Sequence, residues 1–200
     1  AIAGGAAIAA RTHPAAPSGW RTPVRLLVIV VPALAMAAIG KLSWSLVPGY
    51  IAAQMAGAFT GAVLVYLAYL AHWRGTDDPA KKLGIFCTIP AIRSIPANLV
   101  TEVIGTFVLV YCVLAIGSND LSKGIAPIAV ALLVVVIGMC LGGPTGYAIN
   151  PARDFGPRVA HALLPIPGKG GSDFAYAPVP IVGSIIGALL AAFAYTALAA

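Results

Sequence analysis

Long apolar runs separated by short polar segments dominate the pattern of the chain. A bilayer core of about 30 Å requires about 20 helical residues, and four of the runs are about that long. They cover residues 47–71, 99–117, 124–142 and 178–198. The pattern therefore predicts four membrane spans. It also predicts an aqueous loop at His72–Pro96 and a tight polar turn at Ser118–Lys123.

The first part of the chain lacks this pattern. Residues 11–23 are rich in proline and show no helical period, which is typical of a solvated loop or an unstructured arm. The apolar stretch Leu26–Ile39 is short and is interrupted by Pro32. Because Ala1–Ala10 is similar to the end of an apolar segment, we expect the chain to begin within a larger protein.

The composition restricts the class of protein. Hydrophobic residues make up 60% of the chain, charged residues only 9%, and the mean hydropathy is +0.95. A soluble domain carries roughly 25% charged residues, so a soluble enzyme, a disordered chain and a disulfide scaffold are excluded. The net charge of +6 comes from scattered bases, not from the clustered basic face that binds nucleic acid. The chain is predicted to be a multi-pass membrane protein without nucleic-acid partners.

The three cysteines, Cys87, Cys112 and Cys140, lie far apart in the sequence. They have no metal-binding spacing, and an odd number cannot form a complete disulfide framework. We therefore expect packing thiols, with no metal site and no cofactor.

Residues 150–164 predict a helix that enters the membrane without crossing it. Asn150 is a favoured N-cap, Pro151 suits the first helical position, and Asp154 complements the positive end of the helix dipole. At 1.5 Å per residue the segment reaches about 22 Å, which is too short to cross. Pro157 predicts a kink within this half-helix.

The tip of such a half-helix requires a polar environment, because lipid cannot satisfy its free N–H groups. The glycine-rich segment 142–149 before it predicts extended backbone with exposed carbonyl groups. Together with the Asn150 amide and the Arg153 guanidinium, it forms a line of acceptors that leads to a cluster of donors. Such a line suits neutral hydrogen-bonding solutes and opposes cations. The alternative is a capped surface helix, which charged residues beside apolar spans disfavour.

The segment Gly142–Arg158, which contains Asn-Pro-Ala-Arg-Asp, resembles the second Asn-Pro-Ala loop of the major intrinsic proteins. Asp154 indicates the aquaglyceroporins, or glycerol uptake facilitators, and the resemblance covers about residues 35–200. It implies an all-α membrane protein, an aquaporin-like right-handed helical bundle with inverted repeats. It also implies six spans and two half-helices per subunit, a homotetramer, and a place in the plasma or inner cell membrane.

The resemblance also implies roles for individual residues. Asn150 would donate to a passing hydroxyl group, with Pro151 and Ala152 forming the turn. The pore-lining carbonyls would belong to Gly146, Ala148 and Ile149.

A selectivity filter would contain Arg153 as its cation, Tyr147 beside the carbon backbone of a polyol, and Gly138. Gly138 would leave room for glycerol where water-only channels carry histidine. Glu102 would hold the loop backbone, with Asp154 as a second supporting acid. The alternative for Glu102 is an exposed acid near the end of a span.

The two halves of the chain carry a similar pattern of small residues. Residues 56–62 and 182–188 both contain GxxxG, which allows helices to approach closely. A half-helix should therefore precede the first stretch as residues 150–164 precede the second.

The first half nevertheless departs from the family. The first motif aligns with residues 29–31, where no asparagine stands, and its nearest remnant is Val31–Ala33. The two preceding spans are also absent. We thus expect an anomalous segment at residues 1–34, and an incomplete membrane domain at 35–200 with four spans and one clear half-helix. Truncation, a frame shift or divergence could each produce this pattern. Free carbonyl groups facing lipid are costly, so an isolated chain is expected not to form a sealed pore.

The leading functional hypothesis is a passive channel for glycerol, other small neutral solutes and water in the lipid bilayer. A non-conducting remnant of such a channel is the main alternative. A secondary transporter would require titratable groups within the spans, for which Glu102 is the clear candidate. A membrane-embedded enzyme would have to use Asp154, His161 or Glu102, and no nucleophile–base spacing supports it.

Overall fold

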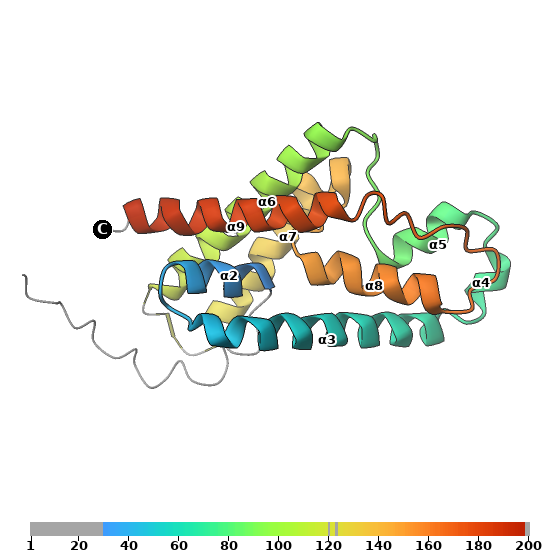
Figure 1. Ribbon diagram of the computed structural model, residues 1–200, viewed down its shortest axis with the longest axis horizontal. Helices are drawn as coiled ribbons and strands as arrows, with labels where there is room; N and C mark the ends of the chain where they lie inside the picture. The colour runs from blue at the N-terminus through green and yellow to red at the C-terminus, as the bar shows by residue number, and fades with distance from the viewer. Residues whose placement is uncertain (1–29, 120, 123, 199–200) are drawn as a thin grey trace, which may run out of the picture.

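The computed structural model describes residues 30–119, 121–122 and 124–198, and within them helices are the only regular secondary structure (Figure 1). The arm predicted at residues 11–23 and the motif position at residue 29 lie outside the described residues. The division predicted at residue 34 stays a prediction, and helix α2 runs across it.

Four long apolar helices confirm the four predicted membrane spans by length and composition. Helix α6 begins earlier than predicted because Pro96 fits its first turn, and α3 ends a few residues earlier than predicted. The long helices are α3 (Val47–Ala68), α6 (Ile95–Gly117), α7 (Ile125–Thr145) and α9 (Pro178–Leu198).

Two shorter helices precede α3 and α9. Helix α8 (Pro151–Leu163) has Asn150 as its N-cap, as predicted, and continues through Pro157. Helix α2 (Val30–Ala38) lies ahead of α3, where the repeat predicted a second short helix. A 3-10 turn, η2 (Trp44–Leu46), joins α2 to α3.

The prediction of an aqueous loop at residues 72–96 is wrong in part, because two short helices occupy it. These are α4 (His72–Gly75) and α5 (Pro79–Phe86). Asp78 starts α5, since its carboxylate accepts the N–H of Ala80 at 2.9 Å. Leu83 and Phe86 are buried on one face of the helix. The charged residues around them in the sequence made this segment resemble a solvated loop.

The prediction of non-helical backbone over residues 142–149 is wrong for residues 142–145, because α7 continues to Thr145. Gly146 ends the helix in the left-handed conformation (φ 80°), and its N–H donates to the Gly142 carbonyl at 2.8 Å. Pro144 removes only one hydrogen bond from the last turn, so the helix tolerates it. Only residues 146–149 connect α7 to the cap of α8 without helix.

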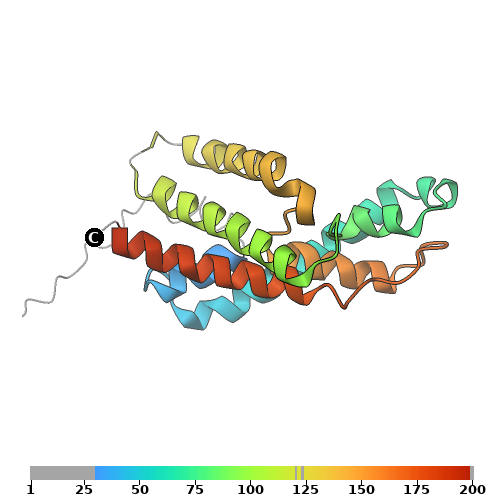
Figure 2. The ribbon, with the colours of Figure 1, turned by 90° about the horizontal axis from the view of Figure 1, so that it is seen from above.

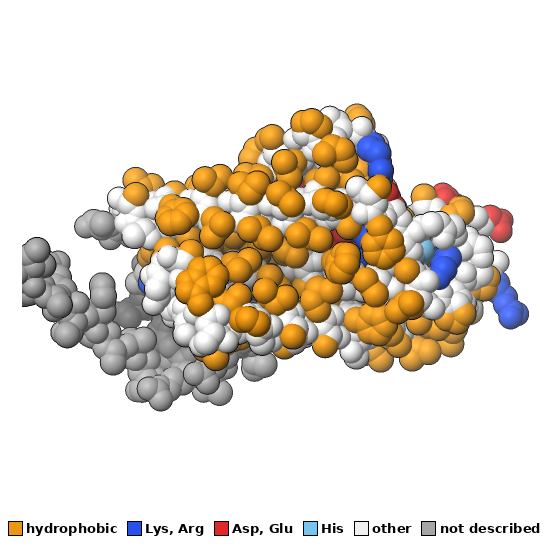
Figure 3. Space-filling view, in the orientation of Figure 1, with side chains coloured by type: hydrophobic (Ala, Val, Ile, Leu, Met, Phe, Trp, Pro, Cys, Tyr) orange, Lys and Arg blue, Asp and Glu red, His pale blue; other side chains and the backbone are white. Residues whose placement is uncertain are grey.

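The short helices link the two halves of the chain. Helix α8 packs against both α3 and α9, and α2 packs against the same two helices. Figure 1 shows α8 beside α3 and α2 beside α9, and Figure 2 shows α6 between α7 and α9. The apolar surface covers most of the face seen in Figure 3, whereas charged side chains gather near α4 and α5. This distribution suits a lipid environment along the long helices.

The two GxxxG stretches have very different surroundings. A Cβ atom at Gly183 would lie 2.7 Å from the Cβ of Glu102, and one at Gly187 would meet the Val103 carbonyl even more closely. No described atom lies within 4 Å of a Cβ placed at Gly57 or Gly61. The close contact between α6 and α9 therefore depends on the glycines of the second stretch, Gly183 and Gly187.

We expect Gly187→Ala to destabilise the protein by about 1–3 kcal/mol, because the added methyl group collides with the rigid backbone of α6. Gly61→Ala is the matched control, since its methyl group enters open space. It should leave stability unchanged or raise it slightly through helix propensity. Thermal unfolding in detergent measures both effects, and equal midpoints for the two variants would contradict the packing described.

Candidate functional site

A cavity of about 790 Å³ lies between α3 and the N-terminal end of α8. On the α3 side its wall consists largely of small side chains, which leave the space open. Ala53, Gly57, Ala58 and Gly61 belong to that wall. On the α8 side the wall contains Asn150, Ala152, Arg153 and Pro157.

The tip of α8 presents hydrogen-bond donors to this cavity. The Asn150 side-chain oxygen accepts the N–H of Ala152 at 3.0 Å, which leaves the Asn150 NH2 group as a donor. Arg153 is exposed and makes no hydrogen bond or ion pair with the described residues. The structure thus brings Asn150, Ala152 and Arg153 together, with Pro151 as the first residue of the helix.

The segment that leads to this tip is held by Glu102. Its carboxylate accepts the Thr145 hydroxyl at 2.7 Å and the N–H groups of Ala148 and Ile149 at 3.1 and 2.8 Å. Glu102 is only 1% exposed, which rules out the alternative of an exposed acid. Three donors from one short segment therefore converge on one buried side chain.

The backbone of this segment adopts an uncommon conformation. Tyr147 and Ile149 both have φ of 42°, in the left-handed region that residues with a Cβ seldom occupy. The hydrogen bonds to Glu102 offset the cost of this conformation. In the described part of the chain, no N–H group donates to the carbonyls of Gly146, Ala148 or Ile149. These oxygen atoms remain available to a donor such as water or an alcohol.

Tyr147 and Gly138 contact each other but do not border the cavity beside Arg153. A Cβ atom at Gly138 would lie 2.9 Å from Cζ of the Tyr147 ring. The space that the missing side chain leaves is therefore filled by Tyr147 in this structure.

A buried ion pair on α8, which the sequence reasoning missed, lies next to Arg153 in the chain. The sequence predicts Asp154 as a complement of the helix dipole and as a supporting acid, but does not indicate its partners. Its carboxylate accepts the N–H and the hydroxyl of Thr88 at 2.8 and 2.6 Å, and the Nε group of Arg158 at 2.9 Å. Asp154 and Arg158 are both fully buried.

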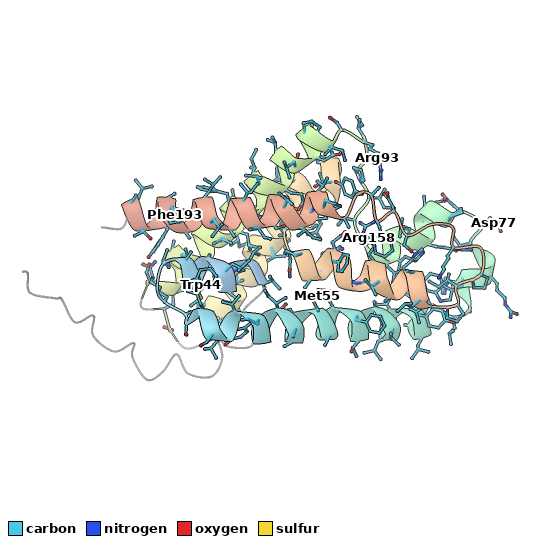
Figure 4. The ribbon with its side chains drawn as sticks, in the orientation of Figure 1. Trp44, Met55, Asp77, Arg93, Arg158 and Phe193 are labelled. Atoms are coloured by element: carbon cyan, nitrogen blue, oxygen red, sulfur yellow. The ribbon has the colours of Figure 1, made fainter. Side chains whose placement is uncertain are left out.

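Arg158 connects α8 to two separate segments. It donates to the carbonyls of Ser172 and Asp173 at 3.0 and 2.9 Å, and to the Thr88 carbonyl at 2.9 Å. Figure 4 shows Arg158 on the side of α8 that faces away from α3. The i,i+4 spacing of Asp154 and Arg158 is a signal present in the sequence, whereas nothing local in the sequence indicates Thr88.

The C-terminal end of α8 is fixed by a lysine. The Lys169 ammonium group donates to the carbonyls of His161, Ala162 and Leu164, each at 2.7 Å. These are carbonyl groups that the end of a helix leaves free. Both ends of the half-helix are therefore tied to the protein around it.

The cysteines follow the prediction only in part. Cys87 is buried, and burial raises the pKa of its thiol to about 12, so it is protonated near neutral pH. Cys140 is exposed on α7, so the interpretation as a packing thiol is wrong for that residue.

The family profile and the relatives that match this chain all indicate the same family. The profile described as "Major intrinsic protein" matches residues 30–195. A "Probable glycerol uptake facilitator protein" of Thermotoga maritima is 56% identical over 189 residues, which cover 89% of this chain and 81% of the relative. The "Glycerol uptake facilitator protein" of Bacillus subtilis is 58% identical over 164 residues, which cover 82% of this chain and 60% of the relative.

A solved structure shares the fold. The X-ray structure of the aquaglyceroporin from Plasmodium falciparum superimposes with a TM-score of 0.73 at 26% identity. The match covers 84% of this chain and 70% of that structure.

Replacing Glu102 by Gln should destabilise the protein by about 1–3 kcal/mol, because the amide leaves a buried N–H group without an acceptor. The side chain keeps its size, so the loss reflects hydrogen bonding and not a cavity. Denaturant unfolding measures the change. Asp77→Asn, at an exposed position, is the control, and a Glu102→Gln variant as stable as this control would contradict the assigned role.

Replacing Arg158 by Met should cost about 3–5 kcal/mol, because the carboxylate of Asp154 then remains buried without its cation. Adding Asp154→Asn to this variant should restore part of the loss, since the uncompensated charge is removed. Unfolding of the two single variants and the double variant gives the coupling energy. Simple additivity of the two single losses would show that the pair is not coupled.

Proposed function

Because the chain belongs to the major intrinsic protein family, a family of membrane channels and not of enzymes, we propose that it conducts glycerol, other small neutral solutes and water. Transport through it is passive and occurs across the cell membrane. The names of the relatives, which are glycerol uptake facilitators, support glycerol as the solute.

The observation that carries the proposal is the set of polar groups at the tip of α8 and in the segment just before it. Asn150 and Arg153 line the cavity as donors, and the carbonyl oxygens of residues 146, 148 and 149, which precede them in the chain, accept no hydrogen bond from the described residues. A polyol both donates and accepts hydrogen bonds, so it can exchange water for these groups at little cost. A cation meets the guanidinium of Arg153 and the positive end of α8, both of which oppose it.

Arg153, Tyr147 and Gly138 form the selectivity filter in this proposal. Tyr147 supplies an apolar ring, and the absent side chain of Gly138 allows the ring to lie against α7. A larger residue at that position would move the ring. The filter thus depends on the size of residue 138 as well as on the charge of Arg153.

The other hypotheses receive less support from the geometry. A transporter would use Glu102 as its titratable group, but that carboxylate is already occupied by three donors. An enzyme would use His161 or Asp154, which are fully buried, and His161 pairs with the Ser172 hydroxyl at 2.9 Å. We therefore also propose that the chain has no catalytic activity.

The proposed assembly is a homotetramer with a separate passage in each subunit. Side chains such as Leu132 and Met139 of α7 are 61% and 81% exposed and apolar, so they can contact lipid or a neighbouring subunit.

Stopped-flow light scattering on proteoliposomes tests the channel function. Vesicles that contain the chain should swell faster in a glycerol gradient than empty vesicles do, with no dependence on proton or sodium gradients. A rate equal to that of empty vesicles would indicate a non-conducting remnant, and gradient-dependent uptake would indicate a transporter. Either result would overturn the proposal.

In the same assay, Gly138→His should lower the glycerol rate more than the water rate, because the imidazole collides with the Tyr147 ring, which belongs to the proposed filter. Gly143→His on the same helix is the matched control, since no described atom lies within 4 Å of a Cβ there. Equal losses of glycerol and water flux in Gly138→His would count against residue 138 as part of the filter.

A further inference from the structure

The connection between α5 and α6 contacts the chain on both sides of the proposed filter. Thr88, near the start of this connection, is only 4% exposed. Its N–H and hydroxyl groups donate to the same carboxylate oxygen of Asp154, the neighbour of Arg153 in α8. Its methyl group lies beside Gly146, where a Cβ atom would be 3.2 Å from Cγ2 of Thr88. One buried residue thus contacts both α8 and the start of the segment 146–149.

A second contact fixes the same connection to the end of α7. The N–H of Ala91 donates to the Pro144 carbonyl at 3.1 Å. Pro144 lies in the last turn of α7, two residues before Gly146. Ala91 and Thr88 therefore contact the chain just before and just after the point where α7 ends. The position of the segment 146–149 depends on these contacts as well as on α7 itself.

Two arginines fix the position of the connection. Arg158 donates to the Thr88 carbonyl at 2.9 Å, and Arg93 forms an ion pair with the Asp173 carboxylate. Figure 4 labels both arginines. The Arg93 guanidinium also lies over the ring of Tyr176, which is fully buried, with its carbon 5.5 Å from the ring centroid. The connection is thus held at its beginning and near its end, so Thr88 has a defined place relative to α8.

We propose that Thr88 is a positioning residue that sets the solute selectivity of the passage. Its hydroxyl group acts through Asp154 on the turn of α8 that carries Arg153. Its methyl group limits the movement of Gly146, and so fixes the place of the Tyr147 ring next to it in the chain. A site is only as exact as the residues that support it. This inference rests on the proposed channel function and adds a residue outside the filter that determines selectivity.

Two substitutions separate the two contacts of Thr88. Thr88→Val keeps the shape of the side chain and removes the hydroxyl group, so Asp154 loses a donor and Arg153 is held less firmly. We expect the ratio of sodium leak to glycerol flux to rise about threefold or more, the size expected for one lost hydrogen bond. Thr88→Ser keeps the hydroxyl group and removes the methyl group beside Gly146. The ratio of glycerol to water permeability should then fall about twofold or more, because the larger solute depends more on the place of the Tyr147 ring.

Proteoliposomes supply both ratios. Stopped-flow light scattering measures glycerol and water permeability, and a sodium-sensitive dye inside the vesicles measures the leak above that of empty vesicles. A ratio does not depend on how much protein folds, so a merely structural role would leave it unchanged. Thr101→Val and Thr101→Ser are the matched controls, because the Thr101 hydroxyl donates to the Ala97 carbonyl of its own helix at 3.1 Å. Equal ratios in the Thr88 and Thr101 variants would overturn the inference.

Amide hydrogen exchange in lipid nanodiscs tests the positioning without reference to transport. Thr88→Ser should speed exchange of the N–H groups of Ala148 and Ile149 about twofold or more, whereas Thr101→Ser should not. Unchanged exchange in Thr88→Ser would overturn the positioning role, whether or not the chain conducts. An unchanged chain without glycerol flux would overturn the channel and the claim about selectivity. Glycerol flux with unchanged ratios would leave the channel intact and overturn the inference about Thr88.

Discussion

The hydrogen bonds that converge on Glu102 fix the backbone segment that leads to the tip of α8. A backbone segment at membrane depth requires partners for its N–H groups, because lipid offers none. Glu102 supplies them for Ala148 and Ile149, and it also holds Thr145 at the end of α7. While these two N–H groups are engaged on one side chain, the carbonyl groups of Gly146, Ala148 and Ile149 accept no hydrogen bond from the described residues. The position of Asn150, and of α8 after it, follows from this segment.

The second fixed point is the buried pair of Asp154 and Arg158. Neighbouring residues on a helix point in different directions, so α8 can present Arg153 to the cavity while Asp154 is buried. The pair binds Thr88 before α6 and Ser172 after α8. Segments distant in the sequence are thus held against one helix, which fixes its rotation as well as its depth. The position of Arg153, the proposed filter cation, depends on both.

The sequence predicted those parts of the structure that depend on local pattern. The four spans, the Asn150 cap and the short helix α8 follow from hydrophobic length and capping residues. The predictions failed where a few residues decide the outcome, as at the end of α7, which tolerates Pro144 in its last turn and ends only at the left-handed Gly146. The sequence analysis also missed Arg158, although its i,i+4 spacing from Asp154 is a local signal, and it missed Thr88, because a contact between distant segments leaves no periodic signal. Membrane class and tip residues were thus predictable, and the supports of α8 were not.

The distribution of charge explains why the polar chemistry of this chain is concentrated in α8. The four long helices contain a single Asp, Glu, Lys or Arg residue, Glu102, and its carboxylate binds backbone. Helix α8 contains three such residues, of which two neutralise each other in the interior. The third, Arg153, is exposed on the cavity wall and forms no ion pair with the described residues. In the proposed channel, one fixed positive charge and uncharged acceptors would discriminate by charge and leave neutral solutes to be sorted by size.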